Sequence, residues 1–303
     1  MRLGKLAVRA AAVGLLATPL AAGAEGAWKM GSVAVLPSQT AASAAVFHRY
    51  MEDAAKLDGQ FRNADGVAAA VKRAAAYDSV QMQQGMVVYA AFVALQDEAY
   101  VTSVRDMEAR YGRAAMLDLM ARDPAGVVRL QGAHTAGLAV TGALRAEGDG
   151  VLASGRSVKQ ASYDLQRQPW SKGPVRNPAA RLAEAKALGQ ARAPSEAETA
   201  RLIEVVHRRP VAAFEGRYVQ RFSPVVEKGL GLAALLVLGE SLEAPQAQAL
   251  MADGRSAGCL RMAKLNFHQC LSVAGPHYED VYCVGQHALL DTGTCVSSAA
   301  GGL

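Results

Sequence analysis

Residues 259–270 read CLRMAKLNFHQC, residues 283–295 read CVGQHALLDTGTC, and these two stretches contain all four cysteines of the 303-residue chain. Cys259 and Cys270 are eleven positions apart. At about 100° per residue, this separation is within about 20° of three full turns of an α-helix. The spacing therefore predicts a helix with both thiols on one face, and the second stretch supplies two more thiols for a partner helix.

The residues between the two stretches predict a sharp turn. Gly275 is suited to end one helix, and Pro276 is suited to begin the next. Two helices joined at this point would run antiparallel, as a hairpin over residues 255–297. Facing positions in such a hairpin lie at nearly equal distances from the turn, so each cysteine before the turn has a matching position after it.

The distances from the turn select one disulfide pairing. Four cysteines allow three pairings, and sequence alone does not normally choose among them. Here Cys270 and Cys283 are nearly equidistant from the turn, and so are Cys259 and Cys295. The sequence therefore predicts nested bridges, with Cys270–Cys283 inside Cys259–Cys295.

The second arm of the hairpin poses two geometric problems. Twelve positions separate Cys283 from Cys295, which places them about 120° apart on an ideal α-helix. We expect Gly293 to end the helix, so that Cys295 can turn back towards its partner. A disulfide also needs Cα atoms within about 7 Å of each other, closer than the roughly 8–10 Å of ordinary helix packing. The small residues expected at this seam are Ala263, Ala274 and Gly285.

This layout resembles the coiled-coil-helix-coiled-coil-helix hairpins, which carry twin cysteine pairs. The likeness covers about 40 residues of the chain. The segments between the paired cysteines hold ten and eleven residues and are longer than those of that family. The resemblance implies a shared architecture, a stapled helical hairpin, and it transfers no function.

A metal site is the competing interpretation of the cysteines, because His268, His277 and His287 lie near them in the sequence. Zinc ligands usually occur in close pairs, with about two to four residues between them, and the spacings here are wider. The sequence therefore predicts disulfides, with no metal ligand and no cofactor.

The start of the chain predicts export. Three basic residues precede an apolar run at 10–20, and small residues at 22–24 fit the rule for signal peptidase. Residues 1–24 therefore read as a signal peptide. The apolar run is too short to span a bilayer, so we expect no transmembrane anchor after cleavage. Export leads to an oxidising compartment, where disulfides persist. We expect a periplasmic protein, with secretion as the alternative.

The rest of the chain reads as helix nearly throughout. Ser195 and Glu198 form a capping box that opens a helix, and residues 133–168 repeat apolar side chains every seven positions, with glycines that could break the middle. Residues 229–239 read as a buried helix, and only residues 32–36 alternate like a strand. The predicted fold class is all-α: an irregular multi-helix bundle that ends in a disulfide-stapled antiparallel helical hairpin.

A basic connection that contains prolines, residues 169–194, predicts a division into two helical domains, 25–168 and 195–303. Basic and aromatic residues cluster at its start and just before it. They could form a docking face for an anionic partner, or a solvated helix face in which the tryptophan is pinned to the core. These residues are Arg156, Lys159, Tyr163, Arg167, Trp170 and Lys172.

Composition and charge narrow the function. Hydrophobic residues make up 51% of the chain, enough for a sizeable core, and much of the formal net charge of +5 comes from the signal peptide. A near-neutral mature chain argues against nucleic acid as a partner. The sequence predicts a non-enzymatic protein of the bacterial cell envelope, a structural, scaffold or adaptor protein that binds other envelope proteins or peptidoglycan. The alternative is a lysozyme-like, glycan-cleaving enzyme with Glu240 as its general acid.

Overall fold

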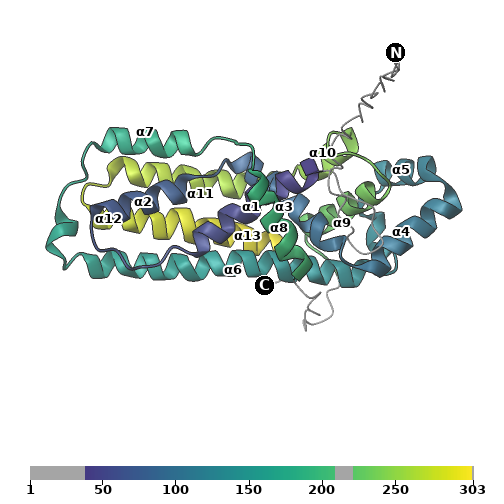
Figure 1. The fold of residues 1–303 in the computed structure, drawn as a ribbon, viewed down its shortest axis with the longest axis horizontal. Helices are drawn as coiled ribbons and strands as arrows, with labels where there is room; N and C mark the ends of the chain where they lie inside the picture. The colour runs from purple at the N-terminus through teal and green to yellow at the C-terminus, as the bar shows by residue number, and fades with distance from the viewer. Residues whose placement is uncertain (1–37, 209–220, 302–303) are drawn as a thin grey trace, which may run out of the picture.

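The computed structural model describes residues 38–208 and 221–301; the predicted signal peptide and the alternating stretch at 32–36 lie outside these ranges. Within them the chain is helical and forms no β-strand, with one isolated antiparallel bridge between Pro174 and Pro276. The all-α fold class is confirmed (Figure 1). The α-helices are α1 Ser38–Ala55, α2 Ala64–Ala75, α3 Ser79–Ala94, α4 Glu98–Tyr111, α5 Arg113–Arg122, α6 Ala133–Leu165, α7 Pro178–Leu188, α8 Glu196–Arg208, α9 Pro224–Val237, α10 Pro245–Met251, α11 Gly254–Val273, α12 His277–Cys283 and α13 Thr292–Ala300. Two short 3₁₀ helices, η1 Pro124–Arg129 and η2 Pro169–Lys172, and a π-helix, η3 Val284–Asp291, complete the chain.

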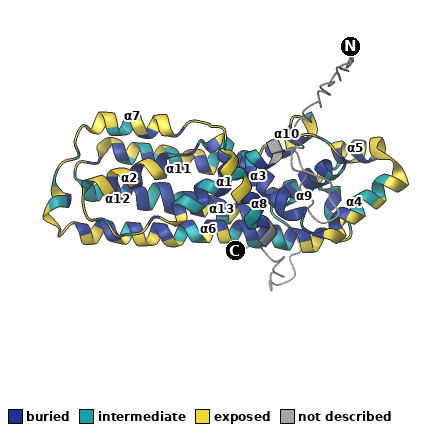
Figure 2. Cartoon of the chain, in the orientation of Figure 1, coloured by how far each residue is buried: buried dark blue, intermediate teal, exposed yellow. Residues whose placement is uncertain are grey.

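Helix α6 is the longest helix in the described residues. It has 33 residues without a break, despite its glycines, and runs along most of the molecule's length (Figure 1). It contacts α12, η3 and α13 at the C-terminal end of the chain, and α1, α3 and α9 elsewhere. Its buried residues face these neighbours, whereas its outer face is exposed (Figure 2). Amphipathic packing therefore outweighs the low helix propensity of its glycines.

Helices α3 and α9 form the apolar centre. Most residues of both are buried, including nearly all of the stretch 229–239 that was read from the sequence as a buried helix. A helix that is apolar on all sides needs neighbours all round, and α3 contacts α1, α6, α9, α10 and α11. None of the helices in the two described ranges has the combined length and apolar character needed to cross a membrane.

The C-terminal hairpin has the predicted register. Helix α11 ends just before Gly275, and α12 begins just after Pro276. Both nested disulfides are present: the Cα atoms of Cys259–Cys295 are 5.7 Å apart, and those of Cys270–Cys283 are 5.6 Å apart. The seam between the two arms is therefore as close as disulfide geometry requires.

The expected helix end at Gly293 was wrong. The chain passes from α12 through the eight residues of η3 into α13 without leaving a helical path. Because a π-helix bonds residue i to i+5, it turns by roughly 82° per residue in place of about 100°. Over the eight residues of η3 this difference removes roughly 140° of rotation. That is enough to cancel the roughly 120° by which an ideal α-helix would turn Cys295 away from the direction of Cys283. A change of helix type, not a helix end, therefore brings Cys295 back to its partner.

Glycines let α6 approach this second arm closely. A Cβ on Gly285 would lie 2.5 Å from the backbone nitrogen of Lys159 in α6, and one on Gly155 would lie 2.9 Å from the backbone nitrogen of Leu290. Gly285 therefore serves the contact with α6, and not the seam with α11 as the sequence had suggested. Of the other expected seam residues, Ala263 is buried on α11 and Ala274 is buried beside the turn.

Side chains cap the N-termini of α8 and α11. The capping box of α8 is formed: the backbone nitrogen of Glu198 donates to Oγ of Ser195 at 3.2 Å, and the backbone nitrogen of Ser195 donates to Glu198 at 2.8 Å. Helix α11, in contrast, is capped by Asp253, whose carboxylate accepts from the backbone nitrogen of Ser256 at 2.9 Å. An aspartate just before the first turn is a strong N-cap, and it sets the start of this helix at Gly254.

We predict that Gly285→Ala destabilises the protein by about 1–3 kcal/mol, the usual cost of overpacking, because its Cβ would meet backbone atoms of α6 that cannot move aside. The matched control is Gly258→Ala on α11, where nothing lies within 4 Å of the added Cβ. There the higher helix propensity of alanine should raise stability by up to about 1 kcal/mol. Urea unfolding measures both. Equal effects of the two substitutions would contradict the close packing of α6.

Loss of the inner disulfide should weaken the hairpin specifically. We expect the double variant Cys270→Ser/Cys283→Ser to lose about 2–4 kcal/mol of stability, because the unfolded chain gains the freedom that the bridge removes. The outer bridge should still form, and non-reducing peptide mapping of the wild type should recover both nested pairs. Recovery of Cys259–Cys270 together with Cys283–Cys295 would refute the hairpin register.

Candidate functional site

The basic and aromatic residues singled out from the sequence follow one edge of the molecule, along the last turns of α6 and into η2. Arg156, Arg167 and Lys172 are exposed, and Tyr163 is 47% exposed. Trp170 is half-buried and packs against the core, as the solvated-face interpretation expected. The cations of this edge are therefore accessible, whereas its tryptophan is largely committed to packing.

Lys159 is held between α6 and the hairpin. Its ammonium group donates to the side-chain oxygen of Gln286 at 2.7 Å and lies 5.6 Å from the centre of the Tyr282 ring. The edge of Tyr163 meets the same ring, with the ring centres 6.3 Å apart. A cation over a tyrosine face is favourable, so Tyr282 lies on the same surface as the basic and aromatic residues singled out from the sequence. Sequence reasoning missed it, because Tyr282 lies more than a hundred residues away along the chain.

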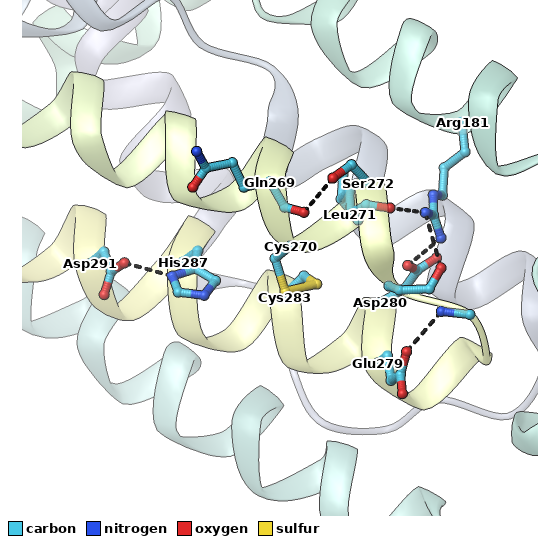
Figure 3. Close-up of a disulfide and its surroundings, with 12 residues drawn as sticks. Arg181, Gln269, Cys270, Leu271, Ser272, Glu279, Asp280, Cys283, His287 and Asp291 are labelled. Carbon is cyan, nitrogen blue, oxygen red and sulfur yellow. Dashed lines mark hydrogen bonds and ion pairs between the residues drawn. A yellow bond between two sulfur atoms is a disulfide. The ribbon is translucent and has the colours of Figure 1, made fainter.

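The π-helix η3 adds a polar pair next to this ring. Nδ1 of His287 lies 2.9 Å from a carboxylate oxygen of Asp291 (Figure 3). The side-chain amide of Gln286 donates to the other oxygen at 3.0 Å. The His287 ring also meets Tyr282 edge-on, with centres 6.3 Å apart. Lys159, Gln286, Asp291 and His287 thus form one connected row, which fixes the orientation of each polar group.

The loop after η2 ties this face to the hairpin turn. The backbone nitrogen of Val175 donates to the carbonyl of Gly275 at 2.8 Å, next to the bridge between Pro174 and Pro276. Trp170 contacts the His277 ring, with centres 6.3 Å apart. The basic and aromatic residues singled out from the sequence and the hairpin turn therefore belong to one end of the molecule.

Arg181 of α7 clamps the turn from the other side (Figure 3). Its guanidinium group pairs with Asp280, in the first turn of α12, and donates to the carbonyl oxygens of Leu271 and Ala274, where α11 ends. The last carbonyls of a helix lack partners within the helix and attract a cation. The side chains of Arg181 and Asp280 are only 9% and 3% exposed, so the pair is a buried one, and removal of one partner would leave an uncompensated charge.

Burial and charge shift two pKa values here. Burial raises the pKa of Asp280 to about 6, although Arg181 acts in the opposite direction. Burial also lowers the pKa of His277, and the positive charges of Arg181 and Arg176 lower it further. Asp280 is thus a buried carboxyl beside a buried cation, and His277 is a partly buried ring near two positive charges.

The sequence also suggested a catalytic residue, Glu240, and a competing metal site near the cysteines. Glu240 follows α9, a helix in the half of the molecule away from the hairpin turn (Figure 1). Its carboxylate pairs with Arg113 at 3.2 Å. All four cysteines are bonded in disulfides. Within residues 38–208 and 221–301, no three His, Cys, Asp or Glu side chains gather in a way that could hold a metal ion.

Comparison with known proteins adds nothing to this geometry. No protein-family model, no curated protein and no solved structure matches the chain.

We predict a specific pH dependence from Asp280. The folded carboxyl keeps its proton up to about pH 6, whereas an unfolded aspartate loses it near pH 4. Between these values the folded state binds more protons, so the contribution of Asp280 to stability falls as the pH rises through this window and is constant above it.

The variant Asp280→Asn isolates this effect, because it keeps an oxygen for Arg181 and cannot ionise. Urea unfolding of both proteins at several pH values gives the difference in free energy of unfolding, wild type minus variant. We expect this difference to fall by about 2–3 kcal/mol between pH 4 and pH 7. A difference that rises with pH, or stays constant, would show that Asp280 is ionised normally.

Proposed function

We propose that the protein is an exported, non-enzymatic helical protein of the cell envelope that works as a scaffold or adaptor in the periplasm. Its docking face is the set of basic and aromatic residues at the hairpin end of α6, and its partner is another envelope protein or peptidoglycan. The observation that carries the proposal is the combination of accessible cations with fixed tyrosine rings on a rigid support. The members of this face are Arg156, Lys159, Tyr163, Arg167, Trp170, Lys172 and Tyr282.

The covalent structure supports the compartment. Two disulfides indicate an oxidising environment outside the cytoplasm, and the signal-peptide pattern gives a route to it. The periplasm fits both features, and it would place the chain beside peptidoglycan and the proteins that bind it.

The chemistry of the face suits an anionic partner. Arginine forms strong charge-assisted bonds with carboxylates and phosphates, and Arg156 and Arg167 are exposed. The tyrosine rings supply flat apolar surface for sugar rings or peptide groups. Lys159, Tyr163 and Tyr282 already contact one another, so little side-chain freedom would be lost on binding. No feature of the described residues favours glycan cleavage by Glu240, whose carboxylate is engaged with Arg113.

We predict that the triple variant Arg156→Gln/Arg167→Gln/Lys172→Gln binds its partner about tenfold more weakly, because three exposed charge contacts of modest strength are lost. Co-sedimentation with purified peptidoglycan is the first assay, and crosslinking in an envelope fraction is the second. The wild-type interaction should weaken at high salt, which screens exposed charges.

The control is Arg110→Gln/Arg255→Gln/Arg261→Gln, which removes the same charge from exposed positions outside the docking face. It should bind as the wild type does. Equal binding by both triple variants in both assays would refute the docking face.

A further inference from the structure

A cavity of about 620 Å³ opens where α5, η1, α9 and α10 meet, in the half of the molecule away from the hairpin turn (Figure 1). Most of the residues that line it are apolar: Leu235 and Leu250 are buried, and Pro245 and Ala249 are exposed. Small-molecule sites have volumes of roughly 300–1,000 Å³ and mostly apolar walls with a few polar groups. The cavity therefore has the size and the lining of a site for a small, largely apolar molecule.

Three prolines fix the walls of this cavity. Pro124, Pro224 and Pro245 all line it, and they stand at the first positions of η1, α9 and α10. Proline locks its own φ angle and suits the first position of a helix. The cavity is therefore formed before a ligand enters, and binding would require little ordering of the protein.

The charged side chains of the cavity are engaged in ion pairs, apart from one. Three of the four that line it form pairs with residues outside it, and each pair is neutral. These pairs are Arg122 with Asp118, Asp123 with Arg129, and Lys228 with Asp253. The fourth residue is Glu227, whose carboxylate has no hydrogen bond or ion pair in the described part of the chain. One negative charge is therefore left over.

Glu227 is held at the wall of the cavity by its helix. It is partly buried and lies in the first turn of α9, where the helix dipole favours a carboxylate. The adjacent cation does not neutralise it, because the ammonium group of Lys228 donates to the carbonyl oxygen of Ala252 at 2.6 Å and to the carboxylate of Asp253 at 2.9 Å. The carboxylate of Glu227 is thus available to a molecule in the cavity.

This carboxylate decides the class of ligand. A purely apolar molecule would remove water from Glu227 without supplying a hydrogen-bond partner, which costs free energy. An anion would be repelled by the same carboxylate. A molecule with one positively charged end would instead form a charge-assisted hydrogen bond with Glu227, while its apolar part contacts Leu235 and Leu250.

We propose that this cavity binds a small primary amine with an apolar body, such as an alkyl chain or an aromatic ring. Glu227 accepts from the ammonium group, and the apolar walls hold the rest of the molecule. The inference goes beyond the proposed function, because the cavity and the docking face have no residue in common.

Ligand-observed NMR titration of the purified protein at neutral pH tests the proposal with three probes that share one alkyl chain: octylamine, octanol and octanoate. We expect octylamine to bind about fivefold more tightly than octanol, because an ion pair at a partly exposed site adds a modest gain. Octanoate should bind most weakly. No binding of octylamine, equal binding of octylamine and octanol, or tightest binding of octanoate would overturn the proposal.

Two glutamate variants locate the charge that is responsible. Glu227→Gln should bind octanol as the wild type does and should bind octylamine no more tightly than octanol. The matched control is Glu243→Gln, which removes the same charge from an exposed position just before α10 and outside the cavity. It should keep the preference for octylamine. Loss of the preference in both variants, or in neither, would overturn the assignment to Glu227.

A third variant tests the apolar part of the site. Ala249→Trp adds a large ring to an exposed wall of the cavity, so it should fill the space and leave the thermal midpoint of unfolding unchanged. Octylamine and octanol should then both bind at least about tenfold more weakly. Unchanged binding of octylamine by a folded Ala249→Trp protein would place the amine elsewhere and overturn the proposal.

Discussion

The close contact between α6 and the second arm of the hairpin is the constraint on which the rest of the structure depends. Glycines stand at the contact on both sides: Gly148 and Gly155 on α6, and Gly285 and Gly293 on the arm. A Cβ at any of them would meet a neighbouring atom at between 2.2 and 2.9 Å. Backbones at this separation gain dense van der Waals contact and leave almost no freedom to slide. The hairpin is therefore fixed along α6, which also packs against α1, α3, α4 and α9.

The second arm must satisfy two partners at once, and this explains its unusual helix type. Its cysteines have to face α11, where both disulfides form, while its glycines have to face α6. An unbroken α-helix would place Cys283 and Cys295 about 120° apart. The π-helix η3 removes this error and keeps the contact with α6. π-Helical segments within α-helices are frequent at functional sites. This one carries Gln286, which accepts a hydrogen bond from Lys159, and His287, whose ring meets the ring of Tyr282.

Polar contacts then turn the hairpin end into a rigid surface. Arg181 connects α7 to the end of α11 and the start of α12, and the loop at 173–177 crosses the turn. A buried ion pair contributes little net stability and is costly to break. We therefore interpret the pair of Arg181 and Asp280 as a positioning contact, which holds α7, the hairpin turn and the neighbouring proposed docking face in one arrangement. A site whose side chains and loops are already ordered loses less conformational entropy when a partner binds.

The sequence by itself determined the all-α class, the turn at Gly275–Pro276 and the nested disulfides, because helical period, capping and turn chemistry are local properties. It also singled out the basic side chains of the proposed docking face, but not Tyr282 or Arg181. Those residues reach the site only because α12 and α7 pack at the end of α6. The roles of Gly285 and Gly293 were misjudged for the same reason. A glycine in a sequence shows where the chain has freedom, but only the tertiary structure shows which backbone it allows to come close.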